Sequence, residues 1–73
     1  MTVYLAKMQV GAGGSWAKGA TEDEAMKRCL EIAKVDWKGL YRLEGPYEMA
    51  IFEDGGTTSF ADDKFLHLAT LEG

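Results

Sequence analysis

The residue types in this chain that most often carry out chemistry are one cysteine, Cys29, and one histidine, His67. A thiol and an imidazole at hydrogen-bond distance make a nucleophile and base pair, so these two side chains would have to meet across the fold. Cys29 lies in the apolar stripe of a predicted helix, and His67 lies in an apolar segment near the end of the chain. A buried cysteine behaves as a small hydrophobic residue. We therefore predict a structural role for Cys29, a hydrogen-bonded structural or a surface position for His67, and no catalytic site.

The acidic residues gather in short clusters at positions 22–24, 53–54 and 62–63. Paired carboxylates bind divalent cations or transfer protons, but the first cluster suits the start of a helix and the other two suit turns. The spacing of a calcium-binding loop is missing, and one histidine with one cysteine cannot supply the four ligands of a structural zinc site. The sequence therefore predicts no metal, no cofactor and no enzyme.

A glycine-rich segment, Val10-Gly-Ala-Gly-Gly-Ser15, follows a predicted strand and invites comparison with phosphate-binding loops. The dinucleotide fingerprint fails because Trp16 stands where a further glycine is required, and the Gly-Lys-Ser/Thr of a Walker loop is absent. A hairpin turn accounts for these glycines.

The composition is that of a small globular protein, with 73 residues, of which 47% are apolar and 27% charged. This length leaves room for a single domain over residues 1–73. The net charge of −4 argues against direct binding to nucleic acid. The longest apolar runs have four residues, far short of the roughly 20 that span a bilayer. With a lone cysteine and no leader pattern, we expect a cytoplasmic protein without a membrane anchor.

The clearest element is an amphipathic helix from about Thr21 to Asp36. Thr21-Glu-Asp-Glu24 reads as a capping box, in which the Thr21 hydroxyl accepts from the Glu24 amide. Gly39 suits the left-handed position that ends a helix. The residues expected to form the structural core on its apolar stripe are Met26, Cys29, Leu30, Ala33 and Trp37.

The remaining chain predicts strands around this helix. Val3–Val10 is rich in β-forming residues, and further strand candidates are Ser15–Lys18, Leu40–Glu44, Tyr47–Glu53 and Thr57–Phe60. Phe65–Leu71 fits a strand or a short helix, and we favour the strand. The sequence therefore predicts an α+β fold, a small antiparallel sheet of four to five strands with one helix packed on one face, in the order β-β-α-β-β.

The predicted strands alternate poorly between apolar and polar residues. In Tyr47–Glu53, Met49 and Ile51 fall on one face while Ala50 and Phe52 fall on the other. Because one helix covers one face only, something else should bury part of the second face. We weigh the C-terminal segment Phe65–Leu71, a second copy of the chain, and a different protein.

In size, charge and order of elements, the segment from Val3 to Phe60 resembles the small inhibitors that phages encode, including anti-CRISPR proteins with a β-β-α-β-β layout. The resemblance rests on this layout and on no motif, so it transfers no functional residue. It implies a protein that occludes a host nucleic-acid-handling complex. The acidic residues that would then mimic phosphates are Glu22, Asp23, Glu31 and Asp62.

The leading hypothesis is a non-enzymatic protein-binding module, with another protein or a second copy in a homodimer as the partner. Large aromatic and charged side chains are effective anchors in such contacts. The residues expected at the contact are Trp16, Tyr41, Arg42, Phe52 and Phe60, together with Glu22, Asp23, Glu31 and Asp62.

Two alternatives use the aromatic residues differently. A small ligand-binding homo-oligomer would hold an aromatic compound at an interface lined by Trp16, Trp37 or Tyr41. An RNA-binding module would stack bases on Tyr41 and Trp37, next to Arg42. The negative net charge and the place of Trp37 on the apolar stripe count against RNA.

Overall fold

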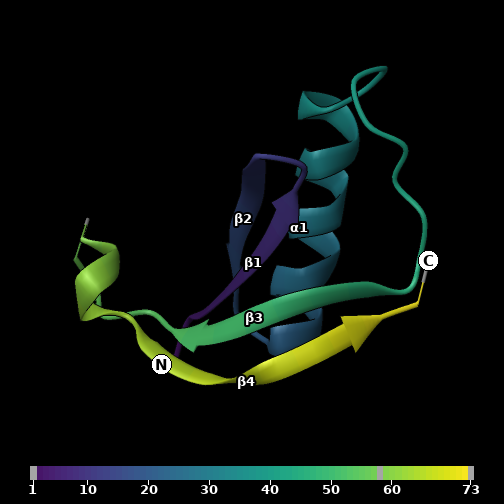
Figure 1. The fold of residues 1–73 in the computed structure, drawn as a ribbon. Coiled ribbons are helices and arrows are strands. Elements are labelled where there is room, and N and C mark those ends of the chain that lie inside the picture. Colours follow the sequence, from purple (N-terminus) through teal and green to yellow (C-terminus); the bar gives the residue numbers. More distant parts are fainter. Residues whose placement is uncertain (1, 58, 73) are drawn as a thin grey trace.

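The computed structural model describes residues 2–57 and 59–72, and the side chain of Phe60 lies outside the described part. The elements in chain order are β1 (Tyr4–Val10), β2 (Gly13–Gly19), α1 (Glu22–Asp36), β3 (Tyr47–Glu53), the 3-10 turn η1 (Phe60–Asp62) and β4 (Lys64–Leu71) (Figure 1). The described strands form one antiparallel sheet in the order β2-β1-β3-β4. With α1 on one face, this is the α+β fold that the sequence predicts.

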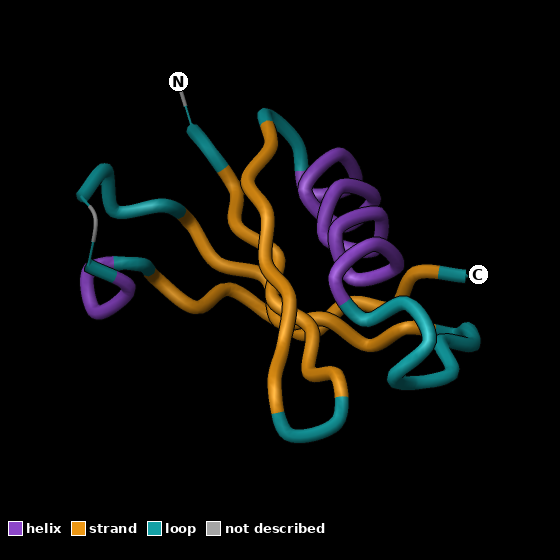
Figure 2. The backbone as a smooth tube through the Cα atoms, turned by 90° about the horizontal axis from the view of Figure 1, so that it is seen from above, coloured by secondary structure: helices purple, strands orange, loops and turns teal. Residues whose placement is uncertain are grey.

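The sheet is strongly twisted. β1 pairs with β2 along its whole length, but with β3 only from Tyr4 to Lys7. Beyond Lys7 the two strand pairs diverge, so β3 and β4 run across the β1–β2 hairpin in Figure 1. Figure 2 shows α1 on one side of the sheet. One helix therefore leaves the opposite face of this sheet without a second layer among the described elements.

The helix α1 begins and ends close to where the sequence predicts. The Glu24 amide donates to Oγ1 of Thr21 at 3.1 Å, which caps the first turn. At the other end the chain leaves the helix at Trp37, and Gly39 takes the left-handed conformation with a φ of +79°. No helix in the described part of the chain is long and apolar enough to cross a membrane.

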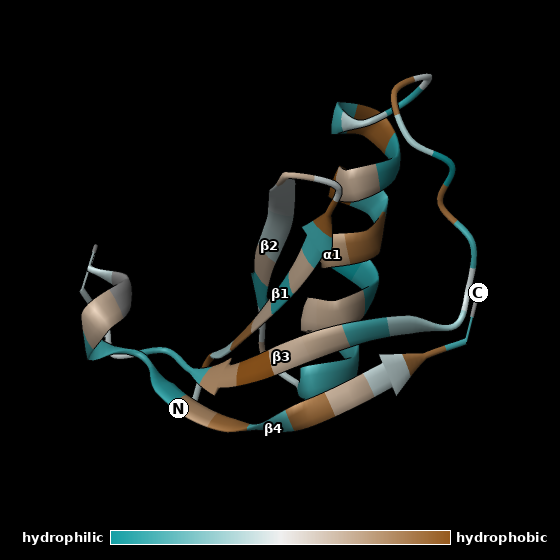
Figure 3. Ribbon diagram, viewed as in Figure 1, coloured by the Kyte–Doolittle hydropathy of each residue, from teal (hydrophilic) through white to brown (hydrophobic). Residues whose placement is uncertain are grey.

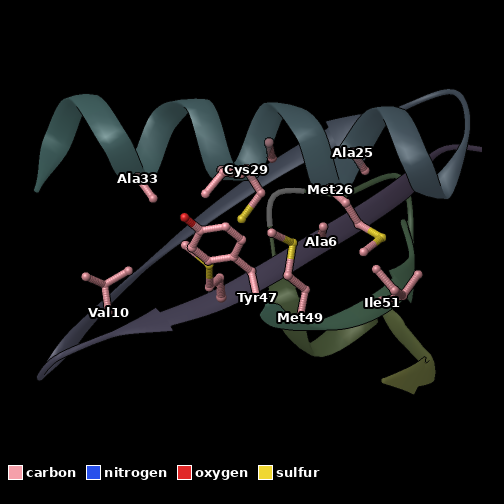
Figure 4. Close-up of a cluster of buried hydrophobic side chains, with 12 residues drawn as sticks. Ala6, Val10, Ala25, Met26, Cys29, Ala33, Tyr47, Met49 and Ile51 are labelled. Atoms are coloured by element: carbon pink, nitrogen blue, oxygen red, sulfur yellow. The ribbon is translucent and has the colours of Figure 1, made fainter. Parts of the chain in front are cut away.

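The main core lies between α1 and the sheet face that it covers (Figure 4). As predicted, the α1 side chains buried in it include Met26, Cys29, Leu30 and Ala33, whereas Trp37 is partly buried at its edge. Alternate residues of β1 and β3 point toward the helix. Those side chains are Ala6, Met8, Val10, Tyr47, Met49 and Ile51.

Cys29 also links α1 to β2. The Ser15 hydroxyl donates to the Cys29 carbonyl at 2.9 Å, and the Cys29 thiol donates to the Ser15 carbonyl at 3.4 Å. Burial raises the pKa of the Cys29 thiol above its ordinary value, although hydrogen bonding from the Ser15 side chain and the Met8 backbone opposes the shift. These contacts fit the structural role predicted for this residue.

The predicted strand Leu40–Glu44 is wrong. After α1 the chain turns, because the amides of Leu40 and Tyr41 both donate to the Trp37 carbonyl. Leu40 is 70% exposed, and this segment pairs with no strand among the described residues. Its β-forming residues lack a neighbouring strand, and tertiary context outweighs strand propensity.

The predicted strand Thr57–Phe60 is also wrong at Thr57, Ser59 and Phe60, because local hydrogen bonds hold this segment, whereas Thr58 lies outside the described residues. The Thr57 hydroxyl donates to the Asp62 carboxylate at 2.6 Å, and the Ala61 amide donates to the Ser59 hydroxyl at 3.3 Å. Such short-range bonds compete with a strand ladder. Phe60 instead begins η1.

The C-terminal segment forms a strand, as favoured from the sequence, and lies beside β3 as β4. Ile51 pairs with His67 and Phe52 with Phe65, so Leu66 is the extra residue of a β-bulge. This position corrects one expectation. The segment extends the sheet and does not cover its second face.

Candidate protein-binding surface

The face of the sheet opposite α1 gathers apolar side chains from every described strand. Strand register sets their positions, because residues that pair across the sheet lie on the same face. One row across the sheet is Trp16, Lys7, Ala50 and Leu68, and the next is Lys18, Leu5, Phe52 and Phe65. We call these eight residues the helix-free face.

The helix-free face combines a buried centre with exposed large side chains. Leu5 is 0% exposed although it does not belong to the core beneath α1. Around it, Trp16 is 48%, Phe65 53% and Leu68 60% exposed. Phe65 packs edge to face on Phe52, with ring centroids 5.5 Å apart. Figure 3 shows hydrophobic residues along much of β3 and β4. The poor alternation in the sequence therefore corresponds to a sheet that is apolar on both faces.

Two lysines stand among these apolar side chains. Nζ of Lys7 lies 4.6 Å from the centroid of the Phe52 ring, a cation–π contact. Nζ of Lys18 lies 3.2 Å from Oδ1 of Asp54. The hydrogen bond from Lys18 lowers the pKa of the Asp54 carboxyl, so this residue stays ionised beside the lysine. The charges among these eight residues are therefore positive, with Asp54 at the edge and the exposed Glu48 near the start of β3 on the same side of the sheet.

Trp37 and Tyr41 form a separate aromatic pair at the tip of the β1–β2 hairpin. Their ring centroids are 5.5 Å apart. The Trp37 ring lies against Gly13 and the Tyr41 ring against Gly11, whose φ is +55°. Trp37 is thus held between the helix end and the hairpin, and does not offer an open ring for stacking.

The structure does not bring all the predicted contact residues together. Trp16 and Phe52 share the helix-free face, whereas Tyr41 is at the hairpin tip and Arg42 is on the following loop, paired with Glu44 at 2.7 Å. For Phe60 the side chain lies outside the described part.

The predicted acidic contacts lie on α1 and η1 and mostly face partners within the chain. Glu22 contacts His67 at 2.6 Å, and Asp23 contacts Lys27 at 3.0 Å. Asp62 accepts from Thr57. Glu31 lines a groove beside β2. These acids do not form one patch with the helix-free face.

The sequence alone does not place Lys7, Phe65 or Leu68 on a binding surface. It makes the C-terminal segment one candidate to bury the second face of the sheet. The signal that places them is strand register. Once β4 pairs with β3, the period of two residues and the bulge at Leu66 bring Phe65 and Leu68 to the helix-free face.

His67 and Cys29 do not meet, since the thiol hydrogen-bonds to Ser15. Nε2 of His67 lies 2.6 Å from Oε1 of Glu22, and Nδ1 lies 3.0 Å from the Leu68 carbonyl oxygen. Because the carbonyl and the carboxylate both accept hydrogen bonds, the ring satisfies both when it is doubly protonated. The Leu68 carbonyl and then Glu22 raise the pKa of His67. This histidine is a structural link between β4 and α1.

Among the described residues, no group of three or more histidine, cysteine, aspartate or glutamate side chains could hold a metal ion. Comparison with protein families, curated proteins and solved structures finds no match to this chain.

Proposed function

We propose that this chain is a non-enzymatic protein-binding module that binds its partner through the helix-free face. The proposal rests on the position of the C-terminal segment, which forms β4 within the sheet and does not cover the helix-free face. Trp16, Phe65 and Leu68 therefore stay exposed around a buried Leu5. Large aromatic and aliphatic side chains around a dry centre are typical of binding hot spots.

Charge indicates the chemistry of the partner. Lys7 lies over the Phe52 ring and Lys18 pairs with Asp54, so the charged members of the helix-free face are both cations. We therefore propose a partner surface with aromatic or aliphatic side chains flanked by carboxylates, since complementary charge favours encounter and register.

Two alternative functions, RNA binding and inhibition by phosphate mimicry, have weaker support. Single-stranded RNA would stack on Trp16 and Phe65, but a chain with a net charge of −4 attracts a phosphate backbone weakly. An inhibitor that mimics phosphate would use Glu22, Asp23, Glu31 and Asp62. Three of these acids already contact partners within the chain.

Selection from a random peptide library on the immobilised protein tests the proposal. The selected peptides should combine leucine or aromatic residues with aspartate or glutamate. Leu68→Ser should weaken their binding by about tenfold or more, as expected of a hot-spot residue. The matched control is Val35→Ser, because Val35 is 75% exposed on α1, and it should leave affinity unchanged.

Three results would contradict this proposal. One is selection of basic peptides. Another is an equal loss of peptide affinity in Leu68→Ser and Val35→Ser. The third is a uridine or adenosine oligonucleotide that binds more tightly than the selected peptides and loses affinity in Leu68→Ser, which would favour the RNA-binding alternative.

A further inference from the structure

A groove of about 600 Å³ runs between β2 and the flank of α1, and its lining shares Trp16 and Lys18 with the β2 edge of the helix-free face. Ala17 of β2 and Ile32 of α1, which is 40% exposed, form apolar parts of its lining. β2 is an edge strand, because β1 is its one neighbour in the described sheet. The groove therefore follows a strand edge.

Hydrogen-bond alternation shows which backbone groups of β2 face this groove. In an antiparallel pair, every second residue of a strand directs its backbone N–H and C=O groups toward the neighbouring strand. The Asp54 amide donates to the Val3 carbonyl at 2.8 Å, so Val3 and the odd-numbered residues of β1 that follow it direct these groups toward β3. Their partners on β2 include Gly14 and Lys18, which therefore direct backbone groups away from β1. Arg28 confirms the direction at Lys18, since its Nη1 donates to that carbonyl at 3.0 Å.

The two elements that form the walls of the groove, β2 and α1, run antiparallel to each other. A Cβ on Gly19, at the end of β2, would meet the backbone of Ala25 near the start of α1. A Cβ on Gly13, at the start of β2, would meet the ring of Trp37, just beyond the end of α1. Positions early in α1 thus lie beside the end of β2.

This arrangement separates charge along the groove. Lys18 and Arg28 lie toward one end, and Asp36 lies toward the other, beside Gly14, with Glu31 between them. Arg28 is already paired with Glu24 at 2.9 Å, whereas Glu31 and Asp36 take part in no ion pair within the described residues. The groove therefore has a shielded basic end and a more open acidic end.

We propose that this groove binds an extended peptide segment of another protein, which adds to β2 as an antiparallel strand. Strand addition supplies main-chain hydrogen bonds, and alternate side chains supply specificity. An antiparallel segment begins at the Lys18 end and finishes at the Asp36 end. It therefore carries an acidic residue near its start, an apolar side chain against Ile32, and a basic residue near its end. This proposal does not rest on the function of the helix-free face.

Two fluorescently labelled hexapeptides test it, Glu-Thr-Val-Thr-Val-Lys and its charge-reversed twin Lys-Thr-Val-Thr-Val-Glu. The first should bind about tenfold more tightly, because only it matches the charges at both ends of the groove. Amide NMR shifts on binding should concentrate in β2 and in the second half of α1.

The double variant Glu31→Lys with Asp36→Lys should reduce or reverse the preference between the two peptides. The matched control is Asp23→Lys with Glu72→Lys, which changes net charge equally with neither residue in the groove lining, and it should keep the preference. The proposal is overturned if neither peptide binds at millimolar concentration. It is also overturned if the preference survives reversal of the groove acids, or if the shifts fall on β4.

Discussion

Phe65 of β4 meets Phe52 of β3 edge to face, with 5.5 Å between ring centroids and 69° between ring planes. This pair ties the C-terminal segment into the helix-free face. Because both rings belong to strands of one sheet, neither covers the other from solvent as a second layer would, and Phe65 stays 53% exposed.

Replacing Phe65 with alanine should lower the free energy of unfolding by at least about 1 kcal/mol, since an aromatic pair of this geometry contributes roughly that much in addition to the area that the ring buries. Urea denaturation measures the change. Val35→Ala, at an exposed position on α1, should change stability by less than about 0.5 kcal/mol. An equal effect of both substitutions would show that the ring pair is not a source of stability.

Gly13→Ala should be clearly destabilising. The new Cβ would stand 2.5 Å from the Trp37 ring, so the ring or the hairpin has to move, at about 1–3 kcal/mol. Gly39→Ala is the control, because a Cβ there meets nothing within 4 Å and only the φ of +79° opposes it, at about 1 kcal/mol. Thermal melts should rank Gly13→Ala as less stable than Gly39→Ala, and the reverse order would contradict the packing of Trp37 on the hairpin.

Cys29 should be unreactive in the folded protein. It is 0% exposed and burial raises its thiol pKa, so little thiolate is present at neutral pH and reagents cannot reach it. Reaction with a thiol-specific disulfide reagent should be more than about 100-fold slower without urea than in denaturing urea. Rapid labelling of folded protein would place the cysteine outside the core.

The contact between His67 and Glu22 should make stability depend on pH. The pKa of His67 is raised in the folded state, so its contribution is fully present below the unfolded pKa and is lost as pH rises through the folded pKa. Glu22→Gln should therefore lower the urea midpoint more at pH 5.5 than at pH 8.5. Asp23→Asn, which breaks the neighbouring contact with Lys27, should have the same effect at both pH values.

Local patterns predict much of this fold. The capping residue Thr21, the apolar stripe through Cys29 and the stop near Gly39 are properties of adjacent residues, so the helix can be identified from the sequence. The predicted strand Leu40–Glu44 fails because strand formation depends on a distant neighbour, and nothing near those residues records whether a pairing strand is available. Thr57–Phe60 fails for a local reason, because hydroxyl and carboxylate side chains there form hydrogen bonds that compete with a strand ladder.

The candidate surface, too, can be predicted from the sequence only in part. Poor alternation in β3 predicts a second apolar face, but its membership depends on which strands lie together and in which register. Phe65 and Leu68 join that face only because β4 pairs with β3 around the bulge at Leu66. The residues that sequence reasoning selects by type alone, such as Tyr41 and Arg42, lie elsewhere.

The most direct test of the central claim maps the binding site of a selected acidic-apolar peptide by amide NMR on isotopically labelled protein. Binding through the helix-free face predicts the largest shifts at Leu5, Lys7, Ala50, Phe52 and Leu68, with α1 little changed. Shifts confined to the solvent side of α1 or to residues 37–46 would contradict it.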